Sequence, residues 1–260
     1  MFDAQAQAKI FVSRGKRIHH AAGQGHSVEV FEHNTLRWMR FGDTDVQSAM
    51  DLSLPWYPVA GYCIAMLAAL CLRPTPKNVL SLGLGGGSVE RFFAEKLPNV
   101  KTVSVEPHPV VTDLAFDFFY LPPATAVVES TGQDYLRQCK QQQDFIFVDM
   151  FDANGHLPCV AQESFHKLLA KNLSPGGMAM LNIVPADETE LLALLQAIRP
   201  TFPHVILSAE ADSKNVVLLC SGEPLTSKMK AGERSHELRP LLGIDFTTAL
   251  SSFTSIPKPA

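Results

Sequence analysis

Short, continuous apolar runs separated by helical stretches extend from residue 79 to residue 219 and limit the fold more than any other feature. An apolar run of three or four residues is typical of a strand with both faces buried, as in a parallel sheet covered by helices. The alternation therefore predicts a doubly wound, Rossmann-like α/β fold. The predicted strands are residues 79–82, 103–105, 126–128, 145–148, 178–181, 205–207 and 216–219, and the predicted helices are residues 89–97, 110–119, 134–140, 162–172 and 188–198.

The chain divides into three predicted parts. Residues 1–58 should form a small N-terminal β unit behind a polar lead-in over residues 1–25, because short segments alternate polar and apolar side chains. Those segments are residues 28–32, 36–41 and 46–50. Residues 59–222 should form the Rossmann-like nucleoside-binding catalytic domain, entered by a helix over residues 59–72. Residues 223–260 show no periodicity and several Pro and Ser residues, so we predict a tail of docked turns there.

Composition and charge argue against several classes of partner. The net charge of −4 gives no attraction to nucleic-acid phosphates, and the longest apolar run, residues 63–72, is shorter than the ~20 residues that a membrane span needs. We therefore expect neither a nucleic-acid nor a membrane partner. The five Cys residues include no C-x-x-C pair and favour a reducing, cytoplasmic compartment. The hydrophobic fraction of 46% leads us to expect a homodimer.

A glycine cluster follows the first strand of the predicted sheet and precedes a helix. Its members are Gly83, Gly85, Gly86 and Gly87. Glycines permit positive φ angles and close approach of a ligand to the backbone, and the helix offers free N–H donors. Glu106 ends the next strand, where a carboxylate can accept both ribose hydroxyls of a nucleoside. The pattern predicts nucleoside binding, and the alternative is a tight turn followed by an exposed acid.

Several motifs follow one another in a fixed order over residues 27–222. They are the β unit, a Tyr-bearing helix, the glycine loop, Glu106, an Asp-x-x-Asp segment after the fourth strand, and Leu173-Ser-Pro-Gly-Gly. Together they resemble the spermidine synthase (polyamine aminopropyltransferase) family, in its spermidine-synthase-like branch of the class I AdoMet-dependent methyltransferase fold. The resemblance implies a transferase that uses decarboxylated AdoMet or AdoMet, and no metal ion, to alkylate a small-molecule amine acceptor. Aminopropyl transfer is the leading expectation.

The resemblance also implies roles for individual residues. Residues 144–158 are similar to the family's D-x-x-D-P-x-G-P loop, so the carboxylate that helps remove the amine proton falls on Asp149 and the one that helps hold the amine falls on Asp152. An amine is protonated at pH 7, and its attack on a carbon beside a sulfonium requires a carboxylate that orients it and takes its proton. Tyr62 would contact the substrate, and Thr131 would contact the adenine.

Among the places where the sequence departs from the family, two remove charge from this site. Ser130-Thr131 stands where the family carries Gly-Asp, so Thr131 offers a hydroxyl and no charge. The further acids that the family provides for a polyamine are missing around Tyr62. Only Asp149 and Asp152 remain as acceptor carboxylates, and we expect another amine or a different nucleophile rather than putrescine.

Other interpretations of the same residues stay open. Asp149 can be a strand-end residue that caps a loop, and an Asx-turn can explain Asp152. A methyltransferase that uses AdoMet would need a group for the donor's carboxylate; Arg91 is a candidate, although a charge on a helix surface is the simpler role. His156 is either a mobile acid or base above the site or a surface residue. A third function class is a non-catalytic nucleoside-binding or scaffold protein.

Overall fold

An eight-stranded sheet forms the centre of the described structure, with strand order β14-β12-β13-β11-β8-β5-β6-β7. The computed structural model describes residues 15–22, 27–41, 46–73, 75–152, 155–209 and 213–257. Strands β7, β6, β5, β8 and β11 run parallel, whereas β13 lies antiparallel to β11 and β12. The strands are β5 (Asn78–Leu82), β6 (Lys101–Val105), β7 (Ala126–Val128), β8 (Gln143–Val148), β11 (Leu173–Ile183), β12 (His204–Ala209), β13 (Val216–Ser221) and β14 (Thr254–Ile256). The predicted doubly wound fold is confirmed.

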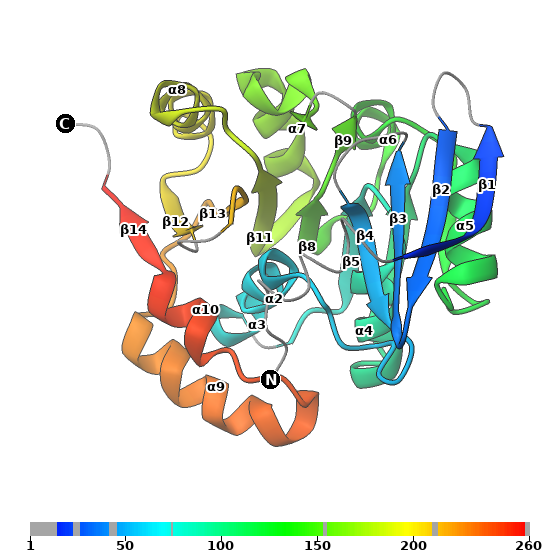
Figure 1. Ribbon diagram of the computed structural model, residues 1–260. Helices are drawn as coiled ribbons and strands as arrows, with labels where there is room; N and C mark the ends of the chain where they lie inside the picture. The colour runs from blue at the N-terminus through cyan, green and yellow to red at the C-terminus, as the bar shows by residue number, and fades with distance from the viewer. Residues whose placement is uncertain are drawn as a thin grey trace.

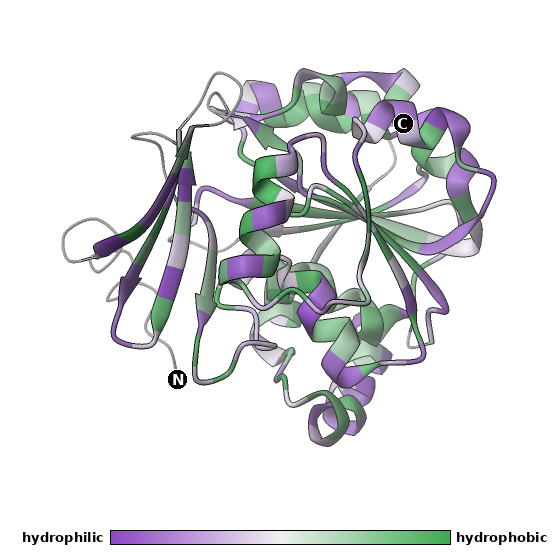
Figure 2. Ribbon diagram, turned by 90° about the vertical axis from the view of Figure 1, so that its right-hand side faces the viewer, coloured by the Kyte–Doolittle hydropathy of each residue, from purple (hydrophilic) through white to green (hydrophobic). Residues whose placement is uncertain are grey.

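Helices cover both faces of this sheet (Figure 2). Phe145 and Phe147 of β8 pack toward α2, α3 and α4, whereas Ile146 and Val148 pack toward α6, α7 and α8. This alternate burial explains why the strands are continuous apolar runs in the sequence. The helices are α2 (Gly61–Leu67), α3 (Ala69–Leu72), α4 (Ser88–Lys96), α5 (Pro109–Phe118), α6 (Gly132–Gln138), α7 (Glu163–Asn172), α8 (Glu188–Ile198) and a 3-10 turn (Pro158–Ala161). No helix of the described ranges is both long enough and apolar enough to cross a bilayer.

A separate antiparallel sheet precedes the main one and stands beside α5 (Figure 1). Its strands in spatial order are β1 (Lys16–Ala22), β2 (Ser27–His33), β3 (Leu36–Phe41) and β4 (Val46–Asp51). Val30 and Met39 of this sheet pack against Val111 and Leu114 of α5. The β unit is therefore confirmed. The polar lead-in was expected over residues 1–25, but its residues 16–22 belong to the β unit itself, because they form β1, which pairs with β2.

The prediction of a tail over residues 223–260 is wrong for the residues described there. They form α9 (Lys228–Leu242), α10 (Thr247–Ser252) and β14, which pairs antiparallel with β12 at the sheet edge (Figure 1). Arg234 of α9 donates hydrogen bonds to the carbonyl oxygens of Cys71 and Leu72, at 2.9 and 3.1 Å. Helix α9 has no apolar stripe and contains Pro240, so its sequence lacks the periodic signal of a helix.

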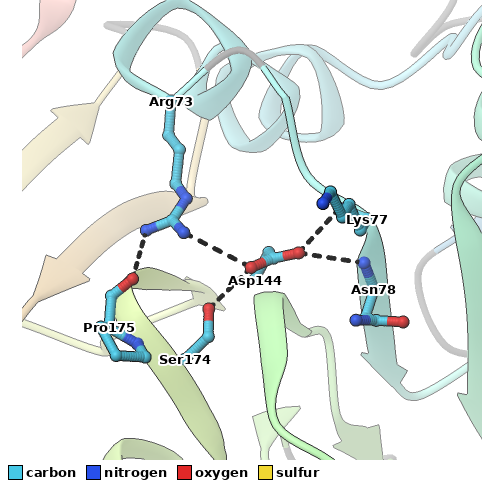
Figure 3. A network of polar contacts seen from close by, with 6 residues as sticks. All are labelled: Arg73, Lys77, Asn78, Asp144, Ser174 and Pro175. Atoms are coloured by element: carbon cyan, nitrogen blue, oxygen red, sulfur yellow. Dashed lines mark hydrogen bonds and ion pairs between the residues drawn. The ribbon is translucent and has the colours of Figure 1, made fainter.

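Asp144, near the start of β8, joins the start of β5 to the start of β11 (Figure 3). Its Oδ2 accepts hydrogen bonds from the backbone N–H groups of Lys77 and Asn78, at 2.7 and 3.1 Å. Its Oδ1 accepts from Ser174 Oγ at 2.7 Å and faces Arg73 at 3.4 Å. Burial by itself raises the pKa of Asp144, but these hydrogen bonds, together with the charge of Arg73, hold that pKa below its ordinary value.

Asp144→Asn should therefore destabilise the fold by about 1.5–3 kcal/mol at pH 7, the usual contribution of a hydrogen bond to a charged group. Because the folded-state pKa is depressed, this stabilisation is present above the unfolded pKa and is lost as the pH falls through the folded one. Urea unfolding of wild type and variant across pH measures both effects. Asp117→Asn, at an exposed position of α5, is the control. An equal loss in the two variants, or one independent of pH, would contradict the assigned role.

Candidate active site

Three neighbouring strand ends place the predicted site residues at one edge of the sheet. Strand β5 lies between β6 and β8 in parallel register, so the residues that follow each strand come together. The Gly83 N–H donates to Val105 O and the Asp149 N–H donates to Leu82 O, both at 2.9 Å. A cavity of about 150 Å³ opens at this edge, and Glu106 lines it together with Gly83 and Asp149. This is where ligands bind in open α/β sheets.

The four glycines of the loop differ in role: two line the cavity and two pack against neighbouring side chains. Gly83 and Gly85 line the cavity and have φ angles of +92° and +51°, which only glycine adopts readily. A Cβ at Gly83 would lie 2.1 Å from the backbone oxygen of Asp149. Gly86 and Gly87 were predicted to bind the nucleoside as well, but they are not among the lining residues. A Cβ at Gly86 would lie 2.6 Å from Ser48 Oγ, and at Gly87 one would lie 2.5 Å from a Leu121 methyl carbon, so packing accounts for both glycines.

Glu106 is a buried carboxylate, only 6% exposed, at the end of β6. Its Oε2 accepts a hydrogen bond from the backbone N–H of Leu84 at 3.3 Å, and its Oε1 accepts one from that of His108 at 3.0 Å. Burial raises its pKa, and the two backbone hydrogen bonds oppose that rise. Each oxygen keeps lone-pair capacity for a further donor in the cavity. The alternative of an ordinary exposed acid is therefore wrong.

Asp149 is held from two sides at the end of β8. Tyr62 of α2 donates its hydroxyl to Asp149 Oδ2 at 3.2 Å, and the Asn182 amide of β11 donates to Oδ1 at 2.8 Å. Burial raises the pKa of Asp149, although both hydrogen bonds oppose this. Burial also raises the pKa of Tyr62, and the negative charge of Asp149 adds to the rise. The sequence predicted Tyr62 and Asp149 but missed Asn182, whose signal is a single amide inside the apolar strand Leu173–Ile183.

Asp149 also lines a second, smaller cavity, of about 30 Å³, on the side of α2 and α4. Tyr62 lines only this smaller cavity, whereas Glu106 lines only the larger one. Gly85 and Gln47 line both, and Gln47 belongs to β4 of the N-terminal sheet. Asp149 and Gly85 thus stand where the two cavities meet.

Two further predicted residues line the larger cavity in different ways. Asp152 lies on β9 (Phe151–Asp152), which pairs with β10 (Gly155–His156). The rest of the proposed Asx-turn lies outside the described residues. Thr131 caps α6, because its Oγ1 accepts the Asp134 N–H at 3.2 Å and donates to Asp134 Oδ2 at 2.8 Å. Its hydroxyl is therefore already used by the cap, which weakens it as a partner for adenine.

Arg91 and His156 are not surface residues. Arg91 is 4% exposed and donates hydrogen bonds to the carbonyl oxygens of Pro55, Gly86 and Phe119, which ties the glycine loop to its neighbours. The His156 side chain is 7% exposed, and its Nε2 lies 3.6 Å from Glu190 Oε1 on α8. The simpler role assigned to each from sequence is therefore wrong, and neither side chain lines the larger cavity.

The fold is the Rossmann-like fold of class I AdoMet-dependent transferases. No protein-family model matches the chain. It is 30% identical over 236 residues to the polyamine aminopropyltransferase of Chromobacterium violaceum, covering 89% of this chain and 90% of that protein. The chain belongs to the polyamine aminopropyltransferase family. The predicted family is thereby confirmed.

Two other likenesses place the chain within a wider group. A probable spermidine synthase from Corynebacterium glutamicum has the same fold, with a TM-score of 0.74 at 17% identity over 92% of this chain and 90% of that one. The eEF1A lysine and N-terminal methyltransferase of Danio rerio is 29% identical over 208 residues, which are 74% of this chain but 30% of that protein. Relatives of the chain therefore include both aminopropyltransferases and a methyltransferase.

Two glycine substitutions should separate ligand binding from folding. At Gly85, a Cβ would meet Ser48 at an ordinary 3.6 Å, so Gly85→Val should fold with a loss of ~1–2 kcal/mol for the left-handed φ and should no longer bind methylthioadenosine. Gly83→Ala should destabilise the protein more, because its Cβ meets backbone. Calorimetric titration and thermal melting of both variants measure this. If Gly85→Val binds methylthioadenosine with unchanged affinity, Gly85 does not belong to the binding site.

Glu106→Gln should weaken methylthioadenosine binding more than tenfold, because a charged acceptor for ribose hydroxyls contributes ~1.5–3 kcal/mol per hydrogen bond. Glu95→Gln, at an exposed position of α4, is the matched control and should bind normally. A 2′,3′-dideoxy analogue should bind the wild type weakly. If it binds as tightly as its parent nucleoside, Glu106 does not hold the ribose.

Proposed function

We propose that this protein transfers an aminopropyl group from decarboxylated AdoMet to a small amine acceptor. The observation that carries the proposal is the position of Asp149, between a cavity lined by Glu106 and a cavity lined by Tyr62. Membership of the polyamine aminopropyltransferase family supports the same reaction.

The larger cavity would hold the nucleoside of the donor. Glu106 would accept the ribose hydroxyls, and Gly83 and Gly85 would allow the ligand to lie against the backbone. Thr131 lines the same cavity and would contact the adenine mainly through packing, since its hydroxyl caps α6. The sulfonium carbon would then come close to Asp149, at the junction with the smaller cavity.

The reaction requires an uncharged amine at that junction. The amine lone pair attacks the aminopropyl carbon bonded to sulfur, the C–S bond breaks, and its electron pair stays on sulfur in methylthioadenosine. The nitrogen loses one proton, and Asp149 is placed to accept it. Burial raises the pKa of Asp149 and so makes it a stronger base than an exposed Asp. Tyr62, whose pKa is also raised, remains a hydrogen-bond donor to the carboxylate.

Methyl transfer from AdoMet is the second candidate, favoured by the methyltransferase relative from Danio rerio. That reaction needs a group for the donor's carboxylate. Arg91, the residue suggested for it by the sequence, directs its donors to backbone carbonyls instead. The comparison of thermal stabilisation by AdoMet and by its decarboxylated form distinguishes the two reactions, and we expect the decarboxylated form to stabilise more.

Asp149→Asn should lower kcat by ~10²–10⁴ and leave methylthioadenosine affinity nearly unchanged, because it removes the proton acceptor but not the nucleoside contacts. Mass spectrometry of methylthioadenosine release with a panel of amines measures the rate. Asp152→Asn is the comparison variant and should raise KM for the amine more than it lowers kcat. If Asp149→Asn retains more than a third of the wild-type rate, Asp149 only caps the loop.

The homodimer and the cytoplasmic location belong to the same proposal. The expectation of a second copy rests on the hydrophobic fraction of 46%. Light scattering after size exclusion measures the oligomeric state.

A further inference from the structure

Asn182 is a buried polar side chain near the carboxyl end of the apolar strand β11. It is 3% exposed and follows Leu181 in β11, opposite Val217 of β13. A buried amide is costly unless both its N–H donors and its oxygen find partners. Here the Nδ2 group donates a hydrogen bond to Asp149 Oδ1 at 2.8 Å, so the carboxylate is the partner of the buried amide donor.

The oxygen of the same amide has its own partner. Asn215, just before β13, donates its Nδ2 to Asn182 Oδ1 at 2.9 Å. Asn215 is fixed in turn by Ser213, whose Oγ accepts the Asn215 N–H at 3.0 Å and donates to Asn215 Oδ1 at 3.3 Å. A continuous chain of hydrogen bonds therefore runs from Ser213 to the Asp149 carboxylate.

We propose that Asn215 and Asn182 form a two-amide relay that positions the Asp149 carboxylate and favours its ionised form. Neither residue needs to touch the substrate, so both are positioning residues. The inference rests on the proposed role of Asp149 in proton transfer.

The relay depends on the orientation of the Asn182 amide, whose Nδ2 group faces Asp149 and whose oxygen faces Asn215. If this amide turned over, its oxygen would face Asp149 Oδ1 and repel the carboxylate. Asn215 prevents this, because its N–H donor requires the Asn182 oxygen on its own side. A hydrogen bond donated to the charged form of an acid lowers its pKa, and Asn182 opposes the rise that burial produces in the pKa of Asp149.

The other titratable groups around Asp149 lie on several elements. Tyr62 of α2 donates a hydrogen bond to Asp149 Oδ2. The next residue, Cys63, is buried, and its pKa is raised by burial and by the charge of Asp149. Glu106, His108 and Asp152 share the larger cavity with it, and Glu90 shares the smaller one. The relay reaches Asp149 through β11 and the residue before β13, and none of these groups lies on those segments, so its removal leaves them in place.

The decisive variant is Asn215→Ala, which changes no atom in contact with Asp149. A general base acts in its ionised form, so activity falls as the pH drops through its pKa. Loss of the relay raises that pKa and moves the acidic limb of kcat/KM to higher pH. We expect kcat/KM on that limb to fall about tenfold in Asn182→Ala, the equivalent of one charged hydrogen bond, and by a smaller factor in Asn215→Ala. The affinity for methylthioadenosine should stay within twofold.

The matched control is Asn172→Ala. Asn172 is also 3% exposed, but it donates to Leu136 O and Leu168 O on α6 and α7 and lines neither cavity at the site. This variant should lose stability without any shift of the pH profile. Equal profiles in wild type, Asn215→Ala and Asn182→Ala would overturn the relay, as would an equal shift in Asn172→Ala.

A spectroscopic titration separates this inference from the proposed reaction. In protein labelled with ¹³C-carboxyl aspartate, the Asp149 signal is assigned by its loss in Asp149→Asn. Its titration midpoint should move to higher pH in Asn215→Ala and stay in place in Asn172→Ala. Absence of turnover in the wild type with such a shift would reject aminopropyl transfer and retain the relay, whereas an unmoved midpoint in Asn215→Ala would reject the relay even if turnover is found.

Discussion

The parallel pairing of β5 with β6 and β8 is the constraint on which the rest of the site depends. Hydrogen bonds from Gly83 to Val105 and from Asp149 to Leu82 continue this pairing beyond the strand ends. They bring residues that are far apart in the chain to one edge of the sheet. The Cβ that Gly83 lacks would lie 2.1 Å from the backbone of Asp149, so the glycine loop and the Asp149 segment can approach only because residue 83 is glycine. The larger cavity and the position of Asp149, the proposed proton acceptor, both depend on this contact.

Burial of carboxylates at this edge has an electrostatic cost that the surrounding donors offset. Glu106 accepts two backbone N–H groups, and Asp149 accepts a tyrosine hydroxyl and an amide. In both, burial raises the pKa and the hydrogen bonds oppose it, so each acid remains a strong acceptor without a cation among these donors. In the proposed reaction the ligands would supply further donors: ribose hydroxyls at Glu106 and, at Asp149, the ammonium group of the acceptor before it loses its proton.

The central strands and helices could be predicted because their burial repeats along the sequence. Helix Glu188–Ile198 has the bounds that its apolar spacing indicated. The C-terminal elements could not be predicted in this way. Helix α9 is stabilised by a Ser227 N-cap, a Gly243 C-cap and contacts from Arg234 to α3, none of which produces an apolar period. Strand β14 has only three residues, and its pairing with β12 depends on where α10 ends.

By itself, the sequence determined which residues follow the buried strands, and hence that Gly83, Glu106 and Asp149 lie together, because parallel strands end at the same edge of a sheet. Only the tertiary structure decided which glycines face the cavity and which ones make room for Ser48 and Leu121. It also decided that Arg91 binds backbone carbonyls, and that Asn182 and Asn215, 33 positions apart, lie in one chain of hydrogen bonds that ends at Asp149. The reason is physical: local conformation follows from neighbouring residues, whereas the partner of a buried polar group is chosen by the packing of distant segments.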